Sequence, residues 1–566
     1  MSTVASDVDR LAEGYWQATL DADPLQATAV GAPGHNDQLP DLTPAGHAAL
    51  IARFEAILRE ADSAEPDAAD PEQALTLAAL RQSTDATLAL LRADAHSYSV
   101  DATWGLQAAI LSAPSYQPLH DPADGQDMLA RWRAIAPTLA EMEASLRRGL
   151  ADGRSPIRAS IARVVEQLDD VLAQPDADGP LLAPLGNRPD SGWSDSDWQA
   201  FAAQLATVVT DEARPAIARF RTFIADEIAP RSRPDDRAGI GQLPGGEELY
   251  RSLVRAHTTT NLGPDEIHAI GLGEVERIDA ETAELGRRVL GTATLAETQE
   301  ALRGDPELHF AGADQIEAAA EGSLRRAEAA VPDWFGRLPR VACEVARMLP
   351  HEEKHSTIAY YREPAMDGSR PGRYYINTWL PATRPRYEAE ALAFHEAVPG
   401  HHLQAAIAQE LTGLPSFRRH AYTTAYVEGW GLYAERLADE MGLYSGDLDR
   451  LGMLSFDSWR ACRLVVDTGL HALGWSIAQA VDFMVAHSAL ARNNIVNEVD
   501  RYLGRPGQAL AYKIGQLQIV RLRSESQARL GTAFDMRRFH DAVLGHGPLP
   551  LETLAESIEG ELWTRS

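Results

Sequence analysis

The segment FHEAVPGHHL, residues 394–403, holds the residues best suited to catalysis in this sequence. In many zinc hydrolases, two histidines one helical turn apart bind the ion, and the glutamate after the first histidine acts as the base. Here Glu396 follows His395 directly, but the next histidines, His401 and His402, come six and seven residues after His395. On a regular helix, His401 would point about 120° away from His395, and His402 would lie about 10 Å along the axis. A regular helix therefore excludes a shared metal ion.

Pro399 and Gly400 interrupt the helix between these histidines. Proline has no N–H to donate to the carbonyl of His395, and its ring clashes with that turn. Gly400 accepts unusual backbone dihedrals at low steric cost. We expect a widened or kinked turn that returns His401 to the usual place of the second ligand, with His402 as the alternative.

A third ligand is expected on the downstream segment AYVEGWGLYAERLADEMG, residues 425–442, which predicts an aromatic-rich helix. Glu428 lies on this segment, and a carboxylate from a following helix completes a zinc site of two histidines and one glutamate. The fourth position would stay open for water, and Glu396 would be the general base that takes its proton. The sequence thus predicts one Zn²⁺ per chain, bound by His395, His401 and Glu428.

A second segment, HEEKH at residues 351–355, matches the regular spacing of a zinc helix. It follows Pro350, is charged at every inner position, and lacks an apolar flank that would bury it. We expect a solvated loop here and no functional metal.

The rest of the chain has mainly the apolar spacing of helices, interrupted by Pro, Gly and Asp clusters. The breaker-rich residues 173–192 predict a long loop, and residues 230–244 predict a join between two helical halves. We expect an N-terminal helical half over 1–235 and a catalytic half over 236–566. Clear helical segments are residues 44–61, 71–93, 126–150 and 157–172.

Strand signals are few. The best is GRYYINTWL, residues 372–380, and residues 341–345 and 357–361 are candidate partners. The expected fold class is a mainly α protein with one small antiparallel sheet just before the FHEAVPGHHL segment.

The bulk composition excludes several classes of partner and compartment. The 566 residues include 52 basic and 82 acidic side chains, a net charge of −30, which disfavours nucleic acids and anionic membranes. Cys343 and Cys462 form no CxxC motif, which disfavours a disulfide framework. The first 20 residues lack the pattern of a secretory signal, and no apolar run is long enough to span a membrane. We expect a soluble cytoplasmic protein, and the sequence does not specify its oligomeric state.

The combination of FHEAVPGHHLQ with YVEGWGLYAE resembles the signature of the bacterial family called domain of unknown function 885. DADPLQATAVG, SRPGRYYINT, RLVVDTGLHALGWS and PGQALAYKIGQ extend the resemblance over nearly the whole chain. That family is grouped with the gluzincin metallopeptidases. The resemblance implies a mainly helical body similar to neurolysin and to the angiotensin-converting and carboxypeptidase relatives, with two halves around a deep cleft. In those relatives the motif ends in Gly-His, as Gly400 and His401 do here, which favours His401 over His402.

Chemistry and resemblance together give roles to further residues. Tyr512 or His471 would donate to the oxyanion that forms during hydrolysis, and Lys513 and Arg521 would hold a substrate carboxylate. The predicted strand, if it lies at a sheet edge, would pair with an extended peptide backbone. Its candidate substrate-binding residues are Tyr374, Tyr375 and Asn377.

The sequence therefore predicts a zinc-dependent hydrolase that cleaves the peptide bonds of short peptides. One alternative keeps the metal but opens an amide in a small metabolite or a natural-product precursor. A second alternative is a non-enzymatic helical binding protein, in which Glu396→Gln would leave the biological activity intact.

Overall fold

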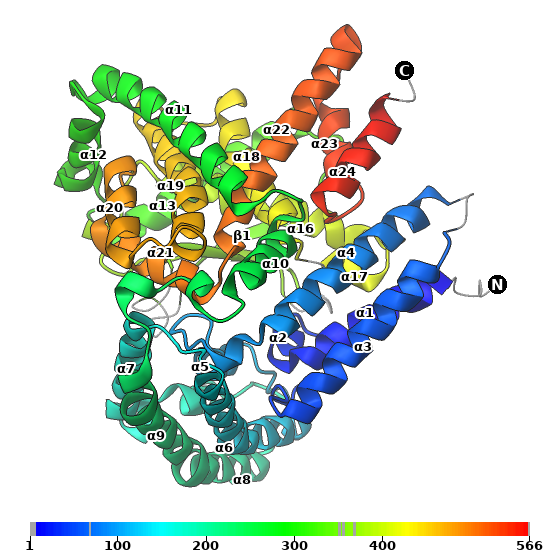
Figure 1. Cartoon of the computed structure of the whole chain (residues 1–566), viewed down its shortest axis with the longest axis vertical. Coiled ribbons are helices and arrows are strands. Elements are labelled where there is room, and N and C mark those ends of the chain that lie inside the picture. Colours follow the sequence, from blue (N-terminus) through cyan, green and yellow to red (C-terminus); the bar gives the residue numbers. More distant parts are fainter. Residues whose placement is uncertain are drawn as a thin grey trace.

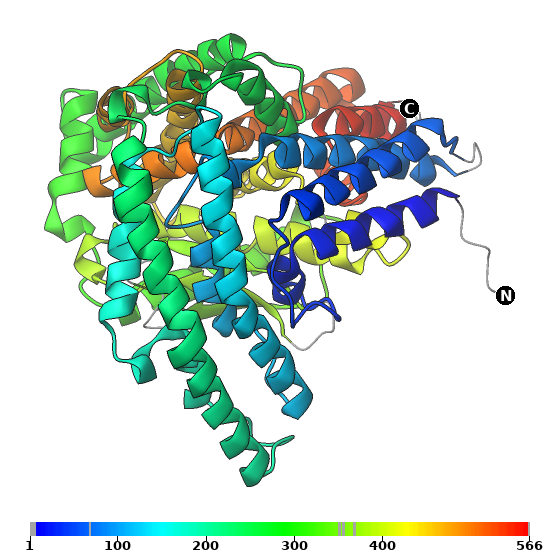
Figure 2. The same cartoon turned by 60° about the horizontal axis from the view of Figure 1, so that its bottom comes forward.

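The computed structural model describes residues 7–66, 70–348, 353, 357–365, 370–420 and 422–563. These residues form a mainly helical protein with a small three-stranded sheet, which confirms the predicted fold class (Figures 1 and 2).

The N-terminal helices pack against the C-terminal part of the chain (Figure 1). Both α3 (Pro44–Ser63) and α4 (Pro71–Ala93) begin with a proline after a capping side chain, Thr43 or Asp70, that accepts a backbone N–H. The predicted helices at 44–61 and 71–93 are thus confirmed. Their core is shared with residues far along the sequence, because Phe54 and Phe417 belong to one buried cluster. The remaining helices before residue 113 are α1 (Asp7–Ala22), α2 (Pro24–Ala29) and α5 (Leu106–Ser112).

A second group of helices extends away from the rest of the molecule (Figure 2) and has its own apolar core, which includes Trp132 and Phe220. The predicted helices at 126–150 and 157–172 belong to it, and the loop predicted at 173–192 contains short 3₁₀ turns. The division into halves at residue 235 stays a prediction. The helices of this group are α6 (Pro122–Ala151), α7 (Arg158–Ala173), α8 (Asp195–Val208) and α9 (Arg214–Phe223).

The C-terminal part is built around α19 (Asp447–His471), whose residues 451–471 are all buried. A helix that is buried on every side must be surrounded by other elements. Among these are α11 (Pro264–Leu290), α15 (Ala389–Glu396) and α22 (Ala511–Leu530). The other helices here are α10 (Gly246–Thr258), α12 (Leu295–Gly304), α13 (Ala313–Ala330), α16 (His401–Glu410), α17 (Ser416–His420), α18 (Thr424–Glu440), α20 (Ile477–His487), α21 (Arg492–Gly504), α23 (Met536–Leu544) and α24 (Leu551–Ile558).

The sheet consists of β1 (Cys343–Arg347), β2 (Ala359–Arg362) and β3 (Gly372–Ile376), in the order β1-β3-β2. The three segments were predicted as strands, but the expected antiparallel sheet is wrong in one pairing. β2 runs antiparallel to β3, whereas β1 runs parallel to it. The chain between β1 and β3 is long enough for the crossover that a parallel pair requires.

Candidate metal centre

The FHEAVPGHHL segment forms two helices instead of one widened helix. α15 ends at Glu396, and α16 begins at His401. Between them the dihedrals of Ala397 (φ −103°, ψ −108°) leave the helical region, and the Val398–Pro399 peptide bond is cis. The expected kink is therefore a complete break, because the proline supplies no N–H to continue the hydrogen-bond ladder.

One hydrogen bond and one close approach of the backbone define the geometry of this break. The indole N–H of the buried Trp430 donates to the carbonyl of Pro399 at 2.9 Å. At Gly400 the backbone passes so close to the preceding turn that a Cβ atom would lie 1.9 Å from the carbonyl oxygen of His395. Only glycine fits there, so the sequence PGH fixes the direction in which α16 leaves.

The break brings His395, His401 and Glu428 into one buried cluster whose ligand atoms all lie within 4.8 Å of one another. Oε2 of Glu428 lies 3.7 Å from Nε2 of His395 and 3.5 Å from Nε2 of His401. The two imidazole rings stand nearly perpendicular, with centroids 4.6 Å apart. Ligands of a tetrahedral zinc ion lie about 3.3–3.6 Å from one another, so the two distances from Glu428 are close to that geometry.

His402 is directed away from this cluster. Its Nδ1 accepts from the hydroxyl of Tyr361 at 3.0 Å, and its Nε2 donates to the carbonyl of Val341 at 3.0 Å. Burial lowers the pKa of His402 to about 4, which keeps the ring neutral. The structure therefore places His401, and not His402, beside His395.

Glu435 lies behind the cluster and was not predicted as part of the site. Nδ1 of His395 donates to Oε1 of Glu435 at 2.7 Å, and Glu435 is fully buried. This bond fixes the tautomer of His395, so that Nε2 is free to bind a metal. Glu435 comes seven residues after Glu428 on α18, and that spacing puts both carboxylates on one helix face, which is a readable signal.

The protonation of the cluster reflects its close packing. Burial lowers the pKa of His395, but hydrogen bonds to Glu428 and Glu435 outweigh it and raise the pKa to about 9. Burial raises the pKa of Glu428, but hydrogen bonds from His395 and His401 bring it well below its usual range. The ionised carboxylates beside the two histidines favour a bound cation. A metal ion would compete with protons for the imidazole nitrogens and the Glu428 carboxylate.

Gly431, also missed from the sequence, provides the space for both rings. A Cβ atom there would lie 2.8 Å from Cε1 and 2.9 Å from Nε2 of His395, and 3.0 Å from Cε1 of His401.

Glu396 lies at the end of α15, directly after His395, and is half-buried. Burial and the charge of Glu396 together raise the pKa of Tyr374 well above its usual value, so Tyr374 lies near that carboxylate. Tyr374 itself is buried at 1% exposure. Tyr375 lies on the opposite face of the sheet, where it stacks on Tyr360 with centroids 4.9 Å apart.

The predicted pairing of the 372–380 strand with a substrate is wrong. β3 is the central strand, and its hydrogen-bonding groups on both sides pair with β1 and β2. The side chain of Asn377 is also engaged, because its amide donates to the carbonyls of Glu353 at 2.8 Å and Thr357 at 2.9 Å.

Two tyrosines lie beside Glu428. The hydroxyl of Tyr422, which the sequence analysis missed, donates to Oε1 of Glu428 at 2.5 Å. Tyr512, predicted from the sequence, is half-buried at the start of α22. Burial and then the charge of Glu428 raise the pKa of Tyr512, so its hydroxyl lies near the cluster. Tyr422 could have been found from the sequence, because it lies just before α18, the helix that carries Glu428.

The prediction that His471 donates to an oxyanion is wrong. Its Nδ1 accepts from the backbone N–H of Ile240 at 3.0 Å, and its Nε2 donates to the carbonyl of Tyr502 at 3.1 Å. His471 is 1% exposed and joins three segments of the core.

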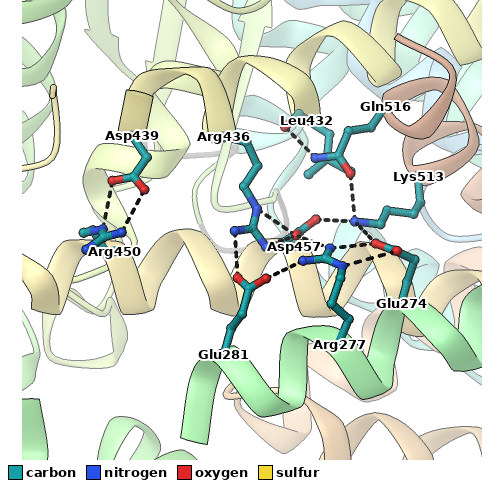
Figure 3. A network of polar contacts seen from close by, with 10 residues as sticks. All are labelled: Glu274, Arg277, Glu281, Leu432, Arg436, Asp439, Arg450, Asp457, Lys513 and Gln516. Carbon is teal, nitrogen blue, oxygen red and sulfur yellow. Dashed lines mark hydrogen bonds and ion pairs between the residues drawn. The ribbon is translucent and has the colours of Figure 1, made fainter. Parts of the chain in front are cut away.

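The substrate-binding roles predicted for Lys513 and Arg521 are also wrong. Nζ of the buried Lys513 lies 2.7 Å from Oδ1 of Asp457 and 3.0 Å from Oε2 of Glu274 (Figure 3). Arg436 contacts the other oxygen of Asp457 at 2.6 Å, so α11, α18, α19 and α22 meet in one ionic network. Arg521 is exposed and pairs with Glu525 one turn further along α22.

We expect Lys513→Met to lower the free energy of unfolding by about 1–3 kcal/mol, because it removes the hydrogen-bonded cation from Oδ1 of the buried Asp457, while Arg436 still contacts the other oxygen. Denaturant unfolding measures the change, and Arg521→Gln is the matched exposed control, expected to shift stability by less than about 0.5 kcal/mol. An unchanged stability of Lys513→Met with a raised KM would instead restore the substrate-binding role.

Of the HEEKH segment, the structure describes only Glu353, so the prediction for its histidines falls outside the described residues. No helix in the described part of the chain combines the length and the apolar character needed to cross a membrane. The cytoplasmic location stays a prediction.

Comparisons with known proteins reveal relatives of the whole chain. A protein described as a putative lipoprotein from Colwellia psychrerythraea is 27% identical, with a TM-score of 0.91 over 99% of this chain and 100% of that one. A putative lipoprotein of unknown function from Shewanella oneidensis is 17% identical and shares the fold, with a TM-score of 0.71 over 98% of this chain and 99% of that one. No curated protein matches the chain. A family model matches residues 24–558, and the chain therefore belongs to the family described as bacterial protein of unknown function, DUF885.

Proposed function

We propose that the protein is a zinc-dependent hydrolase that cleaves the peptide bonds of short peptides. The observation that carries this proposal is the buried cluster of His395, His401 and Glu428, with Glu396 adjacent in sequence and Glu435 bonded to His395.

The donor set suits zinc. Two imidazole nitrogens and one carboxylate oxygen are the protein ligands of a common class of catalytic zinc sites, which leave one position open. A zinc ion held there would polarise the scissile carbonyl and lower the pKa of water to about 7. Glu435 supports this assignment, because metal-binding histidines usually donate their second N–H to a carboxylate or a carbonyl. A carboxylate ligand from a later helix is also the gluzincin pattern, and kinship with those peptidases is part of the proposal.

Each remaining residue of the site has one task. Glu396 takes a proton from the attacking water and passes it to the nitrogen of the leaving amine. The hydroxyl of Tyr512, whose pKa is influenced by Glu428, is the candidate donor to the oxygen on which negative charge develops, whereas the hydroxyl proton of Tyr422 is already donated to Glu428. The break at Pro399 and the bond to Glu435 orient His401 and His395 before substrate arrives, and the hydrogen bond from Tyr422 holds Glu428.

Single-turnover assays of zinc-loaded protein on a library of short peptides test the proposal. We expect new amino termini to appear, and a chelator to stop their appearance. A complete lack of cleavage across the library would count against peptide hydrolysis. Cleavage confined to N-acylated small molecules would favour the metabolite amidohydrolase instead.

A further inference from the structure

A group of arginines lies beside the proposed metal centre, although the chain carries a net charge of −30. Arg460 and Arg463 come from consecutive turns of α19 and are only 4% and 3% exposed. Arg501 lies on α21, and Arg505 follows that helix. We call these four residues the arginine cluster.

Ion pairs within 4 Å join three members of the arginine cluster to two carboxylates, those of Glu498 and Glu435. Glu498 serves two members at once, since Oε2 lies 2.9 Å from Arg463 and 3.1 Å from Arg501. Glu435 lies 3.9 Å from Arg460, but the same oxygen already accepts the hydrogen bond of His395.

Several buried donors of the arginine cluster are also unused. Within the described part of the chain, Nε and Nη1 of Arg460 and Nη1 of Arg463 have no hydrogen-bond partner. A buried charge without full pairing destabilises the fold, so its presence next to a reactive site points to a ligand that completes it.

Tyr512 joins the arginine cluster to the metal centre. The guanidinium carbon of Arg463 lies 4.3 Å from the ring centroid of Tyr512. Burial and Glu428 raise the pKa of this tyrosine, while Arg501, Arg463 and Arg460 lower it. Arg460 lies 3.9 Å from the same oxygen of Glu435 that accepts from His395, so a substrate at the metal centre would lie close to the arginine cluster.

Exposed aromatic residues lie next to the arginine cluster on the solvent side. The guanidinium of Arg505 lies over the ring of Trp104 at 4.8 Å, and Trp104 is 54% exposed. Tyr422 is 58% exposed, although its hydroxyl contacts Glu428. Burial and the charge of Arg501 lower the pKa of Arg505, while Tyr422 and Tyr512 act in the opposite direction.

We propose that the arginine cluster is a carboxylate-binding subsite, and that the enzyme selects short peptides with a carboxylate close to the bond it cleaves. Arginine is suited to this task because its planar group donates two parallel hydrogen bonds to a carboxylate. The carboxylate would come from the C-terminus of the peptide or from an acidic side chain. This inference rests on the proposed hydrolysis of peptides at the neighbouring site.

The test measures equilibrium binding by calorimetry to the Glu396→Gln protein, so that no turnover is needed. Three peptides are compared: a tripeptide with a free C-terminal carboxylate, its C-terminal amide, and the same amide with Asp in place of the last residue. We expect the acid to bind at least about tenfold more tightly than the plain amide. Tight binding of the Asp amide would assign the subsite to side-chain carboxylates, and weak binding would assign it to the C-terminus.

Variants separate the subsite from the metal. Arg460→Gln is the direct variant, but its side chain is buried, so Arg505→Gln, at an exposed position, is the second. Each is expected to reduce the preference for the acid at least about threefold, whereas Arg521→Gln, about 13 Å further along α22 than Tyr512, keeps it. Equal binding of acid and amide, or a preference that survives in a folded Arg505→Gln protein, would overturn the inference.

Failure of the proposed function gives a different result. Preference for the acid in the binding assay, without cleavage of any peptide by the zinc-loaded parent protein, keeps the subsite and removes the hydrolase. Cleavage of acid and amide at the same kcat/KM keeps the hydrolase and removes the subsite.

Discussion

Replacement of Glu396 by glutamine is expected to lower kcat for peptide hydrolysis by about 10²–10⁴-fold, the usual contribution of a general base. Glutamine has the same shape but accepts no proton at neutral pH. Glu396 is outside the three-residue cluster, so the variant should keep the metal content of the parent protein.

Steady-state kinetics and elemental analysis of the same preparation measure both effects. Glu410→Gln is a matched control, because Glu410 ends α16 and pairs with the exposed Arg340. If the Glu396→Gln protein is as active as the Glu410→Gln protein, Glu396 is not the general base. A biological activity that survives without any hydrolysis would favour the binding-protein alternative.

Gly431→Ala is expected to weaken zinc binding by about 10²-fold or more, although alanine is a better helix former than glycine. The added methyl group would lie within 3.0 Å of atoms in both imidazole rings. His395 cannot turn away without losing its 2.7 Å bond to Glu435, and the break at Pro399 fixes the start of α16 that carries His401.

Competition with a chromophoric chelator measures the affinity, and circular dichroism checks that the variant is folded. Gly273→Ala on α11 is the control, since a Cβ atom at that position meets nothing within 4 Å. Wild-type affinity in Gly431→Ala would contradict the placement of the two rings.

The sequence predicted the cluster because its spacing was informative. Helical geometry showed that His395 could share an ion with His401 only if the helix was interrupted. Pro399 and Gly400 lie between these two histidines, where an interruption can bring them together. The extent of the interruption did not follow, because it depends on Trp430, which donates to Pro399 from another helix.

Other roles failed because they depend on partners distant in sequence. The sequence predicts that Lys513 holds a substrate carboxylate, yet Asp457 and Glu274 pair with it in the core. The substrate-pairing role of the 372–380 strand requires a free sheet edge, but β1, which is distant in sequence, pairs with the side that β2 leaves open. The sequence predicts that His471 donates to an oxyanion, but both of its ring nitrogens form hydrogen bonds with the backbone, at Ile240 and Tyr502. Local pattern predicts helices and strands, and it does not reveal which charges they bury.

Metal content of the untagged protein, measured by elemental mass spectrometry, tests the central claim most directly. The account predicts close to one zinc ion per chain, lost in His395→Ala and Glu428→Ala and retained in His120→Ala, whose side chain is 83% exposed. No bound metal in the parent protein, even after reconstitution with zinc, would contradict a metal centre at the break between α15 and α16.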